Sequence, residues 1–251
     1  MALGAVKLLI PFSLAAFFLV GCARTLVPHT VYIPLVKDRG QAEVRISTGT
    51  NASEVQAGYQ ATDRLVVHLA LLNKGRLGAD KGFRSVDVGL GYYFELPNGR
   101  WRLGGHVGVA SGGGSSGSTG ACFECVGPGS ASEYRVRYSY AYVQPTVLLV
   151  EGTRSWGIGL RVGRAYYHRF DRMRADTLGG PIRTMQYTGR QATFVQPTFQ
   201  FGFQVSRWLA LSTVFGLQGF VGVPQADSNM SSFVGQIGAH LLLSKRAAAR
   251  P

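Results

Sequence analysis

Residues 191–220 read QATFVQPTFQFGFQVSRWLALSTVFGLQGF, and two alternating patterns follow one another in this stretch. Apolar residues occupy most alternate positions from Val195 to Val205 and from Leu209 to Leu217, and the positions between them are mostly Gln, Gly, Ser, Thr and Ala. Successive side chains of a strand point to opposite faces, so each run predicts a strand with one apolar face and one polar face. The break at Ser206-Arg207 predicts a hairpin. Long strands that are apolar outside and polar inside are typical of outer-membrane β-barrels.

The composition of the whole chain agrees with this fold class. The protein has 251 residues, of which 34 are glycine, and only 16% are charged. Enrichment in Gly and aromatic residues without heptads favours an all-β protein, and the length suits one domain. After residue 22, no apolar run approaches the roughly 20 residues that a transmembrane helix requires. We therefore predict a single antiparallel transmembrane β-barrel.

The same alternation predicts ten strands, with an eight-stranded barrel as the alternative if the first two do not close it. Short turns are expected at residues 62–64, 97–99, 151–153 and 206–207, and long connections at 73–82, 111–133, 169–190 and 221–230. Outer-membrane barrels have short periplasmic turns and long extracellular loops, so both ends of the barrel domain, residues 41–244, should be periplasmic, followed by a tail at 245–251. The predicted strands are residues 41–49, 53–61, 65–72, 83–96, 100–110, 134–150, 154–168, 191–205, 208–220 and 231–243.

The first 40 residues predict a leader and a tether. Residues 1–21 have the apolar core and small-residue end of a signal peptide. Leu19-Val20-Gly21-Cys22 resembles a bacterial lipobox, which implies cleavage before Cys22 and its acylation, for example with palmitate. The alternative is an ordinary signal peptide with a chance cysteine. Pro28 and Pro34 disfavour helix, so residues 22–40 are expected to form an extended periplasmic tether.

Two motifs resemble a known family. Residues 31–43, VYIPLVKDRGQAE, are similar to the segment before the first strand of small outer-membrane β-barrel lipoproteins of Bacteroidota, and residues 58–63, GYQATD, continue the resemblance. It implies a lipid-anchored barrel and no particular activity. Surface-exported lipoproteins of that phylum tend to carry acidic residues after the cysteine, whereas this chain has Ala23-Arg24-Thr25. The resemblance therefore implies an anchor on the periplasmic side.

Strand parity predicts which side chains face lipid and which face the lumen. Charges facing hydrocarbon cost a few kcal/mol each near the bilayer midplane, so charged residues should point inward and pair there. A ten-stranded interior is narrow and is filled by side chains, so these groups should pack the lumen. The alternative is a narrow anion-preferring pore or uptake accessory. The predicted lipid face includes Val86, Val88, Leu90, Tyr92, Phe94, Tyr138, Tyr140, Tyr142 and Leu148, and the predicted lumen includes Glu43, Arg45, Asp87, Arg102, His106, Arg135, Arg137 and Arg161.

Two long loops contain residues that could bind a partner. Cys122 and Cys125 lie in a Gly/Ser-rich loop and predict a disulfide, with a redox motif and half a zinc site as the alternatives. The loop at residues 169–190 is basic and predicts an anionic partner, such as the phosphates of lipopolysaccharide, or simply contact with neighbouring lipid headgroups. Its cationic residues are Arg169, Arg172, Arg174, Arg183 and Arg190.

His168 is the one candidate for catalysis, because it ends a long strand three residues before Asp171. No second carboxylate pair and no convincing Ser/His/acid set accompany it, so a rim hydrolase or acyltransferase is the least favoured alternative. The net charge of +13 comes without a nucleic-acid-binding motif. We expect a non-enzymatic lipoprotein of the bacterial outer membrane, with a structural or loop-mediated binding role. Its expected partners are outer-membrane lipid and lipopolysaccharide, with another envelope protein as a further candidate, and no cofactor, metal or nucleic acid is expected.

Overall fold

The computed structural model describes residues 29–50, 52–76, 79–119, 131–175, 182–221 and 232–243. Within these ranges no helix is long and apolar enough to cross a membrane. The strands in chain order are β1 (Ala42–Gly49), β2 (Ser53–Gln60), β3 (Leu65–Arg76), β4 (Ala79–Glu95), β5 (Trp101–Thr119), β6 (Ala131–Glu151), β7 (Arg154–Ala175), β8 (Ile182–Tyr187), β9 (Arg190–Ser206), β10 (Leu209–Val221) and β11 (Ser232–Leu243).

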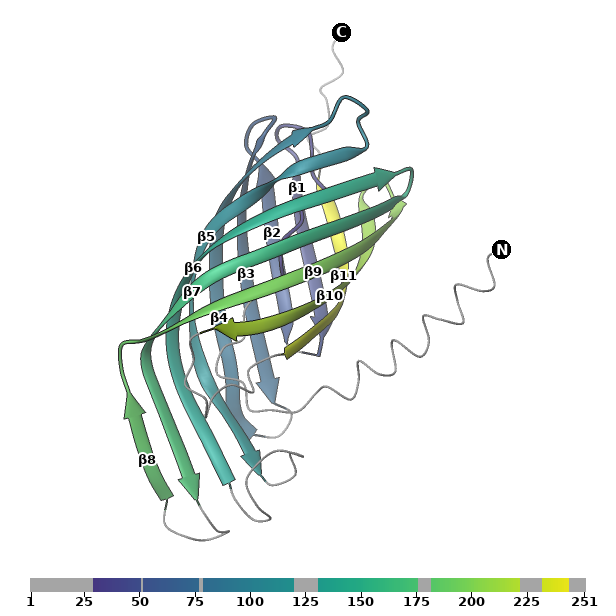
Figure 1. Ribbon diagram of the computed structural model, residues 1–251. Coiled ribbons are helices and arrows are strands. Elements are labelled where there is room, and N and C mark those ends of the chain that lie inside the picture. The colour runs from purple at the N-terminus through teal and green to yellow at the C-terminus, as the bar shows by residue number, and fades with distance from the viewer. Residues whose placement is uncertain are drawn as a thin grey trace, which may run out of the picture.

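Ten of these strands close into an antiparallel barrel, which confirms the predicted fold and strand number (Figure 1). Each strand pairs with its neighbours in the chain, except that β7 pairs with β9 and β8 stands outside the ring. The ring is completed by β1 and β11, which pair from Ala42 opposite Leu243 to Gly49 opposite Gln236. Because β1 pairs with both β2 and β11, the first two strands belong to the barrel and the eight-stranded alternative is excluded.

One side of the barrel extends far beyond the other at the long-loop end. The prediction of a loop at residues 169–190 was wrong, because β7 continues to Ala175 and β8 pairs with this extension alone. Figure 1 shows β8 at the lower end of the molecule, beside the ends of β6 and β7. The rings of Tyr134 and Tyr187 each lie 6.0 Å from the ring of Phe170, and these aromatic contacts hold the extension together.

The outward face is apolar, as strand parity predicts for β4. Val86, Leu90 and Phe94 are each 44–51% exposed, although they are large hydrophobic residues. A soluble protein would bury such a stripe, whereas lipid covers it in a membrane barrel.

The predicted parity of β6 was wrong. Tyr138, Tyr140, Tyr142 and Leu148 are buried in the interior, whereas Arg135 and Arg137 are exposed on the outside. The tyrosines can face inward because their hydroxyls find partners there, as Tyr142 does by donating to Asp87. The two arginines lie beyond the point where β9 stops pairing with β7, at Tyr167 opposite Arg190. They therefore belong to the extension, where an outward charge need not meet hydrocarbon.

The described part of the predicted tether lies inside the barrel. Residues 29–34 and Val36 are buried, and Leu35 is partly buried. We call residues 29–36 the N-terminal segment. The chain then turns at residues 37–41, where Gly40 has a φ of 84° and its N–H donates to the Gln60 carbonyl at 2.8 Å. This turn leads directly into β1 at the short-turn end of the barrel.

Candidate functional site

The N-terminal segment runs along the lumen from the long-loop half to the short-turn end. His29, at its start, contacts Glu54, which is the second residue of β2 after the 50–52 connection. Val36, at its end, contacts Arg102, the second residue of β5 after a short turn. Over its length the segment contacts most strands of the barrel wall.

Glu54 holds the start of the segment. Its Oε1 lies 2.7 Å from His29 Nδ1, and its Oε2 accepts hydrogen bonds from the Thr30 backbone N–H at 3.1 Å and from the Thr30 hydroxyl at 2.5 Å. The other ring nitrogen of His29 lies 2.9 Å from the Ser85 hydroxyl on β4. Glu54 and His29 are completely buried, so these contacts satisfy groups that would be costly to leave unpaired.

Tyr32 anchors the middle of the segment. Its ring stacks on the ring of His68 with 5.0 Å between centroids, and its carbonyl accepts a hydrogen bond from the Gln144 amide at 2.7 Å. Tyr32 reaches the wall at Gly58 on β2, where a Cβ atom would stand 1.7 Å from the tyrosine hydroxyl oxygen. Only glycine at position 58 leaves room for this ring.

The opposite wall contacts the segment just as closely. Cβ atoms at Gly157 and Gly159 on β7 would lie 2.9 Å from Ile33 and 2.5 Å from Val31, respectively. In the ring of ten strands, β2 and β7 are separated by five strand positions in either direction, so they face each other across the lumen. Tyr32 touches one wall, and Val31 and Ile33 touch the opposite wall. The segment therefore spans the full width of the lumen at this level.

Arg161 links the segment to the buried charges of the wall. Its guanidinium lies 3.3 Å from Asp87 Oδ2 and donates to the Gln144 side-chain oxygen at 2.8 and 3.0 Å and to the His29 carbonyl at 3.2 Å. The same guanidinium lies 4.0 Å above the centre of the Tyr142 ring. These contacts of one cation connect β4, β6 and β7 with the N-terminal segment.

The end of the segment is fixed by β1, β2 and β5. The Leu35 backbone N–H donates to Glu43 Oε2 at 2.9 Å, and Arg102 donates to the Val36 carbonyl. Arg102 also donates to the side-chain oxygen of Gln60 at 2.9 Å. The backbone N–H and C=O groups of an irregular segment at membrane depth need hydrogen-bond partners within the protein, because hydrocarbon offers none.

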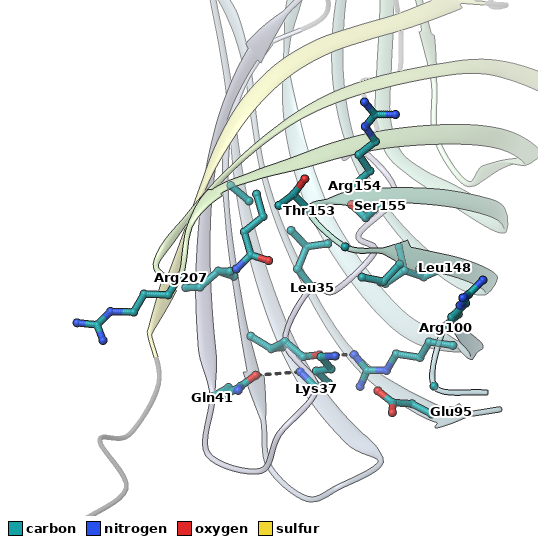
Figure 2. A pocket seen from close by; sticks show the side chains of 18 of the residues that line it. Leu35, Lys37, Gln41, Glu95, Arg100, Leu148, Thr153, Arg154, Ser155 and Arg207 are labelled. Atoms are coloured by element: carbon teal, nitrogen blue, oxygen red, sulfur yellow. Dashed lines mark hydrogen bonds between the residues drawn. The ribbon is translucent and has the colours of Figure 1, made fainter. Parts of the chain in front are cut away.

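Beyond Val36 the short-turn mouth forms a basic pocket of about 240 Å³ (Figure 2). Leu35 and Val36 of the segment line it, together with residues from three short turns. Its charged lining residues are five cations and one anion, namely Lys37, Arg100, Arg102, Arg154, Arg207 and Glu95. Figure 2 shows the side chains of Arg207 and Arg154 directed away from the pocket. Of the five cations, only Arg102 is buried.

Most of the predicted lumen residues lie together in this interior. Glu43, Arg45, Asp87, Arg102, His106 and Arg161 are all buried, and only Arg135 and Arg137 lie outside. The sequence did not reveal that the N-terminal segment contacts four of them, namely Glu43, Arg102, His106 and Arg161. The glycines at 58, 157 and 159 were a signal for it, because they remove side chains from lumen-facing positions where another part of the chain passes.

The residues predicted to bind at the loops are only partly described. Cys22, Cys122 and Cys125 lie outside the described residues. Arg169 lies 2.5 Å from Asp171, Arg172 lies 5.7 Å from the Tyr134 ring centre, and Arg190 lies 3.6 Å from that of Tyr187. Arg183 is exposed. In the backbone register of β7 with β8, the residue opposite it is Arg174. Among the residues described, no three His, Cys, Asp or Glu side chains gather as metal ligands do.

His168 occupies a bulge on the outer wall. It has no partner in the pairing of β6 with β7, which shifts between Arg137 and Tyr138. Its Nε2 lies 2.9 Å from the hydroxyl oxygen of Ser139, and both side chains face outward. Ser139 also lines a shallow groove on the outer wall with Arg164, Tyr166 and Gln191. Asp171, the acid considered with His168 from the sequence, contacts Arg169 instead.

No protein-family model and no curated protein matches the chain. Among solved structures, the outer membrane protease OmpT from Escherichia coli is similar over 80% of this chain and 89% of its own, with a TM-score of 0.50 and 10% sequence identity. The NanC porin is similar over 80% of this chain and 98% of its own, with a TM-score of 0.35 and 10% identity. The chain thus has the fold of outer-membrane β-barrel proteins.

Proposed function

We propose that this chain is a non-enzymatic outer-membrane barrel with a structural or binding role in the bacterial envelope, and that its lumen does not conduct. The observation that carries the proposal is the N-terminal segment, which spans the lumen between Gly58 and Gly159. A pore needs a continuous water path, and here side chains and backbone meet across the interior. The narrow anion-preferring pore is disfavoured further because Arg161 is paired with Asp87 and fully buried.

The surfaces left for binding are the two mouths. At the short-turn mouth, the pocket beside Lys37, Arg100 and Arg154 favours an anionic group of an envelope component. At the other end, the β6–β7–β8 extension presents Arg135, Arg137 and Arg183 outward, where they suit lipopolysaccharide phosphates. We place a lipid anchor at Cys22 as part of the same proposal, on the strength of the lipobox-like sequence.

Single-channel recording in planar bilayers tests the closed lumen. The refolded protein should insert and stay silent at all voltages. Stable conductance steps from a homogeneous preparation would overturn the proposal and return the pore to first place. Insertion is verified separately by protease protection, so that silence is not confused with failure to insert.

A second candidate is an ester hydrolase on the outer wall, which the 2.9 Å contact of Ser139 with His168 favours. The Ser139 oxygen would attack the carbonyl carbon of an acyl ester while its proton passes to His168 Nε2. The ester C–O bond then breaks as the alcohol leaves with that proton, and water releases the acid from the acyl-serine. Ser139→Ala and His168→Ala should each change the lipid acylation profile of a producing strain. Ser111→Ala, directly opposite Ser139 on β5, is the control, and an unchanged profile in the first two variants removes this candidate.

A further inference from the structure

The direction in which the N-terminal segment runs determines the side of the barrel from which the chain enters it. From His29 to Val36 the chain passes from the level of Glu54 to the level of Arg102. Glu54 lies beside the 50–52 connection between β1 and β2, and Arg102 lies beside a short turn. The described chain therefore begins, at His29, on the long-loop side of the barrel.

A return of the chain to the short-turn side through the lumen is blocked. The segment already touches opposite walls, with Tyr32 against Gly58 and Val31 against Gly159. Buried side chains fill the space on either side of it, including Arg45 and Gln200 on one side and His68, Tyr93 and His106 on the other. A second backbone strand with its own side chains would have to displace these groups.

The strands of the barrel wall are short at the point where the segment starts. β1 and β2 have eight residues each, whereas β6 and β7 have 21 and 22. His29 contacts Glu54, the second residue of β2, so it lies close to the long-loop end of that strand. Cys22 precedes His29 by seven residues, which reach about 25 Å when extended. That length is enough to pass over the low rim and reach the lipid beside it.

We infer that the chain threads the barrel from the long-loop mouth, and that Cys22 is acylated and anchored in the leaflet on that side. The inference rests on the proposed outer-membrane location, in which the long loops face outward. It places the anchor in the outer leaflet, opposite to the periplasmic side that the Ala23-Arg24-Thr25 sequence implies by resemblance. The segment at residues 29–36 then joins a lipid anchor on the cell surface to a barrel whose first strand begins at the periplasmic end.

Thiol labelling in whole cells tests the inference. The full-length protein carries Cys122→Ser and Cys125→Ser, and single cysteines are added as Thr25→Cys or Arg207→Cys. Arg207 lies in the turn between β9 and β10, so it reports the short-turn side. A protein that keeps reduced Cys122 and Cys125 reports the long-loop side. A membrane-impermeant maleimide is applied to intact cells and to cells with a permeabilised outer membrane.

The expected result is that Thr25→Cys is labelled in intact cells to the same extent as the loop cysteines, while Arg207→Cys is labelled only after permeabilisation. Absence of label on Thr25→Cys in intact cells overturns the inference, whether or not permeabilisation exposes it. Incorporation of an alkyne palmitate tests the anchor itself, and it should be lost in Cys22→Ser. Wild-type protein without palmitate would remove the anchor. Bilayer recording is independent of these outcomes, so a conducting lumen and a periplasmic Thr25 are separate failures.

Discussion

The guanidinium of Arg161 lies 3.3 Å from the carboxylate of Asp87, and neither side chain has any exposed surface. Arg161 also holds the N-terminal segment through the His29 carbonyl. The pair therefore contributes both to the barrel wall and to the position of the segment inside it. Removing one member would leave an uncompensated charge in the interior.

We expect Arg161→Met to lower the free energy of unfolding by about 3–5 kcal/mol, the usual cost of breaking a buried ion pair. Urea titration of the protein in detergent micelles measures this change. Arg164→Met is the matched control, because Arg164 is on the same strand but exposed outside, and it should change stability by no more than about 0.5 kcal/mol. Equal effects of the two substitutions would contradict the pairing. The Asp87→Asn/Arg161→Met double variant should lose less than the sum of the single losses.

Gly58→Ala should force Tyr32 away from the wall, since the added methyl would meet the tyrosine hydroxyl at 1.7 Å. Such overpacking costs about 1–3 kcal/mol, and the segment should become more accessible to protease. Gly75→Ala is the control, because nothing lies within 4 Å of a Cβ there. In a Tyr32→Ala background the Gly58→Ala change should have no further cost. A persisting cost in that background would place the conflict elsewhere.

Glu54→Ala should loosen the start of the segment and open the lumen intermittently. It removes the acceptor for His29 and for both donors of Thr30, and each buried donor left unpaired costs about 1–3 kcal/mol. Brief conductance events should appear in planar bilayers where the wild-type protein is silent. Glu95→Ala, at the exposed rim of the short-turn pocket, should stay silent. If both variants are silent, Glu54 does not control the position of the segment.

The three tryptophans of the chain should report one membrane interface. Trp101, Trp156 and Trp208 are all 38–54% exposed and lie next to short turns. Trp and Tyr favour the headgroup level of barrels, so lipids brominated near the headgroup should quench the fluorescence more than lipids brominated near the chain ends. In Trp156→Phe, the quenched fluorescence should fall by the part that Trp156 contributes in the wild-type protein. Equal quenching at both depths would contradict a single girdle.

The barrel could be predicted from sequence because its signals are local. Alternation along residues 195–205 and 209–217 and turn residues such as Asn98-Gly99 mark strands and short turns independently of the rest of the chain. The strand ends at the long loops could not be predicted, because Ser and Gly at 111–119 and Arg at 169–174 have no strand preference of their own. Their pairing partners across β5, β6 and β7 supply the order.

The parity of β6 and the role of the N-terminal segment needed tertiary information. Tyr138, Tyr140 and Tyr142 suit lipid headgroups as well as a polar interior, and only the presence of Asp87 and His68 within reach decides between them. Val31, Tyr32 and Ile33 have no strand periodicity beyond three residues, and nothing local shows that they lie inside a barrel. Most of the predicted lumen charges are buried, as expected when a charge on the lipid face costs a few kcal/mol near the bilayer midplane.

The threaded segment has a consequence for how the molecule is assembled. It is continuous with β1, and β1 forms one side of the seam that closes the ring with β11. When β1 pairs with β11, the ring therefore encloses the segment that leads into β1. Once the seam has formed, the segment can leave the lumen only through one of the two mouths of the barrel. Separation of β1 from β11 would therefore free the segment as a whole, whereas loss of the contact between Glu54 and His29 would loosen it only at its start.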